Sequence, residues 1–241
     1  MKAILKSEFL KINNNSYRKL LLALPFLAAL IAFLLVGPQI LESFTIYWWE
    51  ALFLYALVGL LFLKDTKNEQ RAGRFQNVNL DKLRSKIRLA KMVLIALQLI
   101  VASVFLMIII KIIEIFLYPE FMSVNTFSDG LTLFMMWLSV LWNIAFLYYL
   151  SDKLNPYLIV VGNTFICLLI APLMAQTKLW FIFPYTYHYK VAQVIMHLKP
   201  SGDLEEHYGN GNYFTIILSV LLSIVLTLLI SYLMKRKRRY L

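Results

Sequence analysis

Five polar side chains inside long apolar runs of this sequence are candidates for a functional role: Glu50, Lys111, Glu114, Asn143 and Asn163. Burying such groups in a membrane costs free energy, so each of them is first considered for a functional role such as ion or substrate transport. Lys111 and Glu114 stand three residues apart, so we expect them to pair near the outer boundary of the membrane, where Lys111 can snorkel. Glu50 follows two tryptophans and is expected near the outer surface. For the two asparagines, hydrogen bonding between helices is the preferred interpretation.

Motifs for catalysis, phosphate binding or metal binding are absent from the sequence. It contains no Gly-x-x-x-x-Gly-Lys-Ser/Thr loop, no His-Glu-x-x-His and no Gly-x-Ser-x-Gly. Its three histidines, His188, His197 and His207, lack the spacing of a zinc site, and we expect them at the surface or interface. Cys167 is the only cysteine and is expected to be a packing residue. We therefore expect no catalytic residue, metal or cofactor in this chain, which we do not interpret as an enzyme.

The elements that position these residues are six apolar runs. Hydrophobic residues make up 61% of the chain, against about 45–50% in soluble domains. Runs that do not alternate polar with apolar residues exclude a β-barrel and favour helices of about 20 residues. The sequence predicts an all-α, polytopic membrane protein with one domain, 1–241. Its spans are expected at 20–36, 46–63, 92–117, 131–150, 157–175 and 213–234.

Basic residues are concentrated on one side of this topology. Twenty of the 24 lysines and arginines fall in four segments that alternate to the same side of the spans: 1–19, 64–91, 151–156 and the C-terminal tail. The positive-inside rule places these segments, and both termini, on the cytoplasmic side of the membrane. The net charge of +11 is therefore attributed to the basic segments that orient the protein in the membrane, and no nucleic-acid partner is expected.

Three segments outside the spans carry further patterns. Leu5, Phe9 and Ile12 share one face of a predicted N-terminal interfacial helix, for which an ordered soluble lead-in is the alternative. The loop 64–91 predicts a short helix, a break at Gly73 and an amphipathic helix entering the third span; an anchor for anionic lipid is the alternative. The outer loop 176–212 is aromatic at its start and predicts a short helix before the last span. There, a generic aromatic belt and a ligand-contacting surface are equal alternatives.

This architecture resembles the ABC-2-type permeases. The most specific local similarity lies in the loop, which reads Asn68-Glu69-Gln70-Arg71-Ala72-Gly73-Arg74-Phe75 and ends in Ala90-Lys91. Within that family the chain looks most like the permeases of lantibiotic (bacteriocin) immunity transporters, which often have a Trp and then a Pro-aromatic pair after the fifth span. Trp180 and Pro184-Tyr185 are similar to that pattern.

The resemblance implies a location in a bacterial plasma membrane, a mechanism and a set of partners. A separate ABC ATPase subunit would bind ATP, and its contact with this chain would lie in a coupling helix, which involves Glu69, Arg71, Gly73, Arg74 and Phe75. A second permease subunit, identical or a sister chain, would complete the membrane part. The implied cargo is a cationic, amphipathic antimicrobial peptide that is removed from the membrane and released outside, where the outer loop with Trp180, Pro184 and Tyr185 lies.

Other functions remain open from the residues alone. The cargo could be another amphipathic or lipid-like molecule. The chain could also be a membrane scaffold or enzyme that acts without ATP, although no cluster of acids and histidines is visible at one membrane face. An ion-gradient carrier would need an ionisable residue near the midplane of the membrane, and the sequence predicts none.

Overall fold

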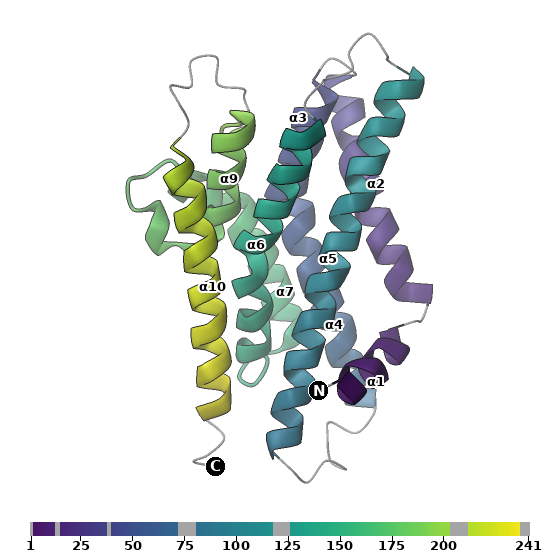
Figure 1. Cartoon of the computed structure of the whole chain (residues 1–241), viewed down its shortest axis with the longest axis vertical. Helices are drawn as coiled ribbons and strands as arrows, with labels where there is room; N and C mark the ends of the chain where they lie inside the picture. Colours follow the sequence, from purple (N-terminus) through teal and green to yellow (C-terminus); the bar gives the residue numbers. More distant parts are fainter. Residues whose placement is uncertain are drawn as a thin grey trace.

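The structure is a computed structural model that describes residues 2–12, 15–37, 40–71, 81–117, 126–202 and 212–236. Every element within these ranges is a helix (Figure 1). Six helical stretches are long and apolar enough to cross a membrane, as predicted: Tyr17–Val36, Leu41–Arg71, Ser85–Phe116, Thr126–Leu150, Pro156–Ala175 and Tyr213–Lys235. The chain is therefore all-α, and its six candidate spans indicate a multi-pass membrane protein.

The first half of the chain contributes the short helix α1 (Lys2–Ile12) and three spans. The first span is α2 (Asn15–Val36). The second consists of α3 (Leu41–Trp48), the π-helical turn η1 (Trp49–Phe53) and α4 (Leu54–Arg71). The third is α5 (Asp81–Leu117). With 37 residues, α5 is about 55 Å long, so it extends well beyond a hydrocarbon layer of about 30 Å. The predicted amphipathic helix is thus one continuous helix with the third span, and the predicted break at Gly73 lies outside the described residues.

The second half contributes three more spans and one short helix. The fourth span is α6 (Thr126–Leu150), and the fifth combines α7 (Pro156–Phe165), the π-helical turn η3 (Ile166–Ile170) and α8 (Ala171–Ala175). Two 3-10 turns, η4 (Trp180–Ile182) and η5 (Pro184–Thr186), lead to α9 (Tyr187–Met196), and α10 (Tyr213–Arg236) is the last span. Asn155 caps α7 by accepting the backbone N–H of Tyr157 at 3.0 Å, and Pro156 follows at the first helical position.

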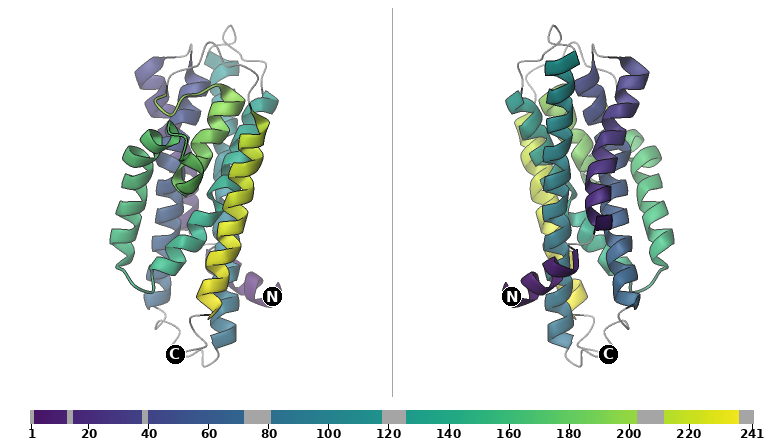
Figure 2. Two further views of the ribbon diagram at one scale, coloured as in Figure 1. Left: turned by 90° about the vertical axis from the view of Figure 1, so that its left-hand side faces the viewer. Right: turned by 90° about the vertical axis from the view of Figure 1, so that its right-hand side faces the viewer.

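The second span lies at the centre of the bundle. Its helices are the most buried of the six spans, while α10 is the least buried and exposes apolar side chains along much of its length. The helix α6 packs against α5, α9 and α10, and α4 packs against α7 (Figures 1 and 2). Gly59 permits the close approach of α4 to α7, because a Cβ atom there would lie 2.8 Å from Cγ1 of Val160.

One end of the bundle brings together the segments that the charge pattern assigned to one side. The helix α1, the end of α4, the start of α5 and the last turn of α10 all lie there (Figures 1 and 2). We call it the basic end. In both views of Figure 2, α1 runs across the bundle axis rather than along it. The other end, where α3 and α6 begin and α5 ends, is called the opposite end.

Candidate functional site

A buried lysine joins four helices at the basic end. The Nζ atom of Lys91, on α5, lies 2.9 Å from Oδ1 of Asp65, is paired with Glu69, and lies 3.8 Å from Oε2 of Glu8. Tyr148 of α6 donates a hydrogen bond of 2.7 Å to Oδ2 of the same aspartate. These five residues, from α1, α4, α5 and α6, are called the Lys91 cluster. Since its charged groups are largely withdrawn from water, the cluster holds the ends of four helices in fixed register.

A groove adjoins the Lys91 cluster. It has a volume of about 590 Å³ and extends from the last turns of α4, past Tyr148, to the turn between α6 and α7. One wall is held by a bidentate ion pair, in which the guanidinium of Arg88 lies 2.6 and 3.0 Å from the two carboxylate oxygens of Asp152. At the other wall, Nζ of Lys67 lies 4.8 Å from the ring centre of Tyr157. The groove is therefore polar, mixed in charge and large enough for side chains of a docked protein.

The predicted coupling residues divide into three groups. Glu69 is half-buried and directed at Lys91, so it is an internal ion-pair partner rather than a freely exposed contact. Arg71 ends α4 and is exposed, as is Gln70 beside it. Gly73, Arg74 and Phe75 lie outside the described residues.

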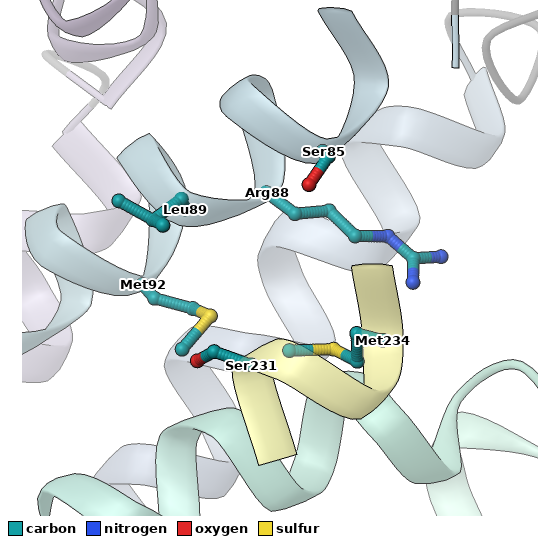
Figure 3. Close-up of a pocket in the computed structure, with 6 residues that line it drawn as sticks. All are labelled: Ser85, Arg88, Leu89, Met92, Ser231 and Met234. Carbon is teal, nitrogen blue, oxygen red and sulfur yellow. The ribbon is translucent and has the colours of Figure 1, made fainter. Parts of the chain in front are cut away.

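A smaller pocket lies between α5 and α10 at the same end (Figure 3). Met92 of α5 faces Ser231 and Met234 of α10, while the side chain of Arg88 extends away from Met92. Its volume of about 20 Å³ is close to the minimum of roughly 10–15 Å³ that one water needs. This pocket is a loosely filled contact between two spans and holds no cargo-sized ligand.

The two asparagines meet in the core, as predicted. Nδ2 of Asn143, on α6, donates a 2.7 Å hydrogen bond to Oδ1 of Asn163, on α7. The hydroxyl of Tyr185 donates to the same oxygen at 2.9 Å, and Nδ2 of Asn163 reaches the backbone oxygen of Tyr55 at 3.5 Å. Tyr185 is accordingly buried and packs edge-on against Trp142, with ring centres 4.9 Å apart. Tyr185 therefore has a structural role as a hydrogen-bond donor in the core. Its ring is not part of an exposed surface that could contact a ligand.

The first aromatic residues of this segment, Trp180 and Phe181, lie nearer the surface than Tyr185. Trp180 begins η4, is half-buried and lies edge-on to Tyr187 with ring centres 6.3 Å apart. Pro184 begins η5, and the two 3-10 turns direct the chain back into the bundle as α9.

Glu50 and His188 are both buried, which for His188 contradicts the expectation from the sequence. His188 was expected at the surface or interface, yet it is 0% exposed, as is Glu50. The span containing Glu50 begins at Leu41, upstream of the predicted 46, so Glu50 stands nine residues after the start of this span. Burial lowers the pKa of His188 to about 3, so its imidazole is neutral. His197 is exposed, and His207 lies outside the described residues.

Cys167 is buried as expected of a packing residue, but it also connects this pair. Its Sγ lies 3.7 Å from the backbone oxygen of Glu50 and 3.7 Å from Nε2 of His188. Both oxygens of the Glu50 carboxyl and Nδ1 of His188 have no hydrogen-bond partner among the described residues. Within those residues, no group of three or more His, Cys, Asp or Glu side chains is arranged to hold a metal ion.

A second ion-pair cluster lies at the opposite end. Lys111 and Glu114 pair at 3.0 Å, as predicted, but Nζ of Lys111 also lies 3.0 Å from Oδ2 of Asp129 and 4.0 Å from Oε2 of Glu42. Neither Asp129 nor Glu42 was predicted from the sequence as a partner of Lys111. Each stands in the first turn of a span that starts where the third span ends, and this topological match could have identified them. We call these four residues the Lys111 cluster.

No protein-family model, curated protein or solved structure matches this chain. Its activity must therefore be inferred from its own residues and their arrangement.

Proposed function

We propose that this chain is the membrane-spanning subunit of an ATP-driven exporter of the ABC-2 type, similar to the permeases of lantibiotic immunity transporters. A separate ATPase subunit supplies the energy, and a second permease subunit, identical or a sister chain, completes the membrane part. The cargo is a lantibiotic or a similar cationic, amphipathic peptide that leaves the membrane on the outer side.

The observation that carries this proposal is the position of the Lys91 cluster. Arg71 and Gln70 are exposed at the end of α4, while Glu69 in the same turn pairs with Lys91 of α5. A partner that moves this turn therefore moves α4 and α5 together. Asp65 extends the connection through Tyr148 to α6. Force applied at the basic end reaches three spans through buried polar contacts, which is what an energy-coupling surface requires.

The charge distribution supports an inward-facing basic end. With this end in the cytoplasm, the positive-inside rule is satisfied by twenty of the 24 basic residues. The helix α1 then lies along the inner leaflet, where Phe9 and Leu10, both more than half exposed, can enter the lipid. The helix α9 and the Lys111 cluster then lie toward the outer side.

A lipid-like cargo is the second candidate, and one cavity favours it. An apolar groove of about 230 Å³ opens between α5 and α6 and is lined by Met107, Leu133, Phe134 and Trp137, with Gly130 at its edge. A groove of this size accepts a segment of an acyl chain or an apolar side chain of a peptide. Competition between labelled lipid and labelled peptide would assign the cargo.

The test is a pair of matched charge reversals at the two ends of the bundle. Arg71→Glu and Lys178→Glu both replace an exposed cation by an anion. Affinity purification of the full chain from native membranes should recover an ATP-hydrolysing subunit with the wild type and with Lys178→Glu. Recovery and ATP turnover should fall at least tenfold with Arg71→Glu, while its membrane insertion stays normal. Equal recovery with both variants, or no ATPase with the wild type, would contradict the proposal.

A further inference from the structure

Glu50 is a carboxyl group buried inside a span without a partner. It lies in η1, is 0% exposed, and neither of its oxygens has a hydrogen-bond partner among the described residues. Along the helix it stands eight residues from Glu42 and fifteen from Asp65, which is about 12 and 22 Å at 1.5 Å per residue. Because those two acids belong to the clusters at the two ends, Glu50 lies well inside the hydrocarbon layer.

The groups around Glu50 supply no compensating charge. The titratable side chains that interact with Glu50 from the packed elements are Cys167 of η3 and His188 and Tyr189 of α9. Tyr47 of α3 and Tyr55 of α4 lie beside Tyr189 in the same region. His188 is neutral, because burial lowers its pKa to about 3. Lys190, the cation on α9, donates a hydrogen bond of 2.8 Å to Oε1 of Gln193. The ionisable residues of α2, residues 17–19, lie at the basic end.

Burial of a carboxylate under these conditions is strongly unfavourable. An ionised carboxylate without a counter-ion or hydrogen bond loses several kcal/mol or more on leaving water, whereas the neutral acid avoids the ionic part of this penalty. Glu50 is 0% exposed, so its carboxyl group is enclosed by protein atoms rather than by water. The carboxyl is therefore expected to be protonated in this conformation.

We propose that Glu50 is a proton-binding site, at which one carboxylic acid is kept neutral by the contacts of η1 with η3 and α9. If these contacts separate and water enters, the O–H bond breaks, the proton passes to water and a carboxylate remains. Two π-helical turns meet at this point, with Sγ of Cys167 3.7 Å from the backbone oxygen of Glu50. Such turns occur frequently at functional sites in helices. Any conformational change that brings water to the Glu50 carboxyl then releases its proton. This holds for whatever partner causes the change.

Infrared spectroscopy of the full-length protein tests this site directly. The protein is measured at pH 7 in an ester-free detergent, so that the C=O stretching band of protonated carboxylic acids is not obscured by lipid esters. We expect the wild type to show this band and Glu50→Gln to lose the part that corresponds to one carboxyl. Asp152→Asn is the matched control, because Asp152 is ionised in its bidentate pair with Arg88, and its band should equal that of the wild type.

Several outcomes would overturn the proposal. A wild type with no protonated-acid band, or a Glu50→Gln variant whose band is unchanged, would show that Glu50 is ionised. If Glu50→Gln does not fold, Glu50→Asp retains the acid and is expected to shift the band rather than remove it; an unshifted band would refute the assignment. The measurement needs no ATPase and no cargo, so its result is independent of the exporter proposal.

Discussion

Replacing Lys91 by methionine should destabilise the protein strongly, because the substitution leaves three carboxylates without their common cation. The Lys91 side chain is only 5% exposed, and its partners Glu8, Asp65 and Glu69 are 6, 13 and 20% exposed. Removing one partner of a buried ion pair typically costs about 3–5 kcal/mol. The partial exposure of Glu69 lets water relieve part of the repulsion, so we expect a value near the lower limit, about 3 kcal/mol.

The assay is thermal unfolding of the purified protein in detergent, followed by the loss of helical circular dichroism. For a chain of this length, 1 kcal/mol corresponds to a shift of roughly 2–4 °C in Tm, so Lys91→Met should lower Tm by about 10 °C. Lys91→Met combined with Asp65→Asn should cost less than the sum of the two single changes, by roughly 0.5–3 kcal/mol, since the two side chains share a contact.

Lys153→Met is the matched control for this experiment. Lys153 is exposed, with its Nζ 5.4 Å from the ring centre of Tyr149, and its loss should change stability by no more than about 0.5 kcal/mol. A cost below about 1 kcal/mol for Lys91→Met, as for an exposed ion pair, would refute the claim that the cluster fixes the helices at the basic end. Strict additivity in the double variant would refute the direct contact.

Three further predictions use the same unfolding assay. Gly59→Ala should cost about 1–3 kcal/mol through overpacking, because its Cβ would meet Val160 at 2.8 Å; failure of a second change, Val160→Ala, to recover the loss would contradict this cause. Asn163→Leu should cost roughly 2–4 kcal/mol, since Tyr185 and the partner amide lose their acceptor; a neutral effect would exclude a structural role for this network. Because the pKa of His188 is lowered to about 3, the unfolded chain binds more protons below about pH 6.5. The stability that neutral His188 contributes should be complete above that pH and decline as pH falls toward 3; an unchanged pH profile in His188→Gln would contradict it.

The spans could be predicted from the sequence because hydropathy is a local property. Each apolar run, and the basic segments between them, specify a helix without reference to any distant residue. Helix ends were less predictable, since α3 begins at Leu41 and α5 at Asp81, both upstream of the apolar runs. Backbone hydrogen bonding extends a helix into polar sequence wherever packing or ion pairs support it. Hydropathy contains no information on such extensions.

The site was predictable only where both partners lay close in sequence or shared an unusual residue type. Lys111 and Glu114 are three residues apart in sequence. Asn143 and Asn163 are amides within apolar runs, and this unusual residue type led to the prediction of hydrogen bonding between helices. The ion pairs of Lys91 join residues that are 22 to 83 positions distant from it in sequence, and only the folded arrangement shows them. The burial of Glu50 escaped prediction for a related reason: its depth depends on where α3 begins and on how α9 packs against η1.

In an exporter driven by a cytoplasmic ATPase, the basic end must face the cytoplasm, where the ATP-hydrolysing partner can reach it. The only cysteine, Cys167, is buried, so the wild type is a blank for a membrane-impermeant maleimide. Arg71→Cys and Thr177→Cys place one exposed thiol at each end of the bundle. In intact cells we expect position 177 to be labelled and position 71 to be labelled only after permeabilisation. Labelling of position 71 from outside intact cells would contradict the account.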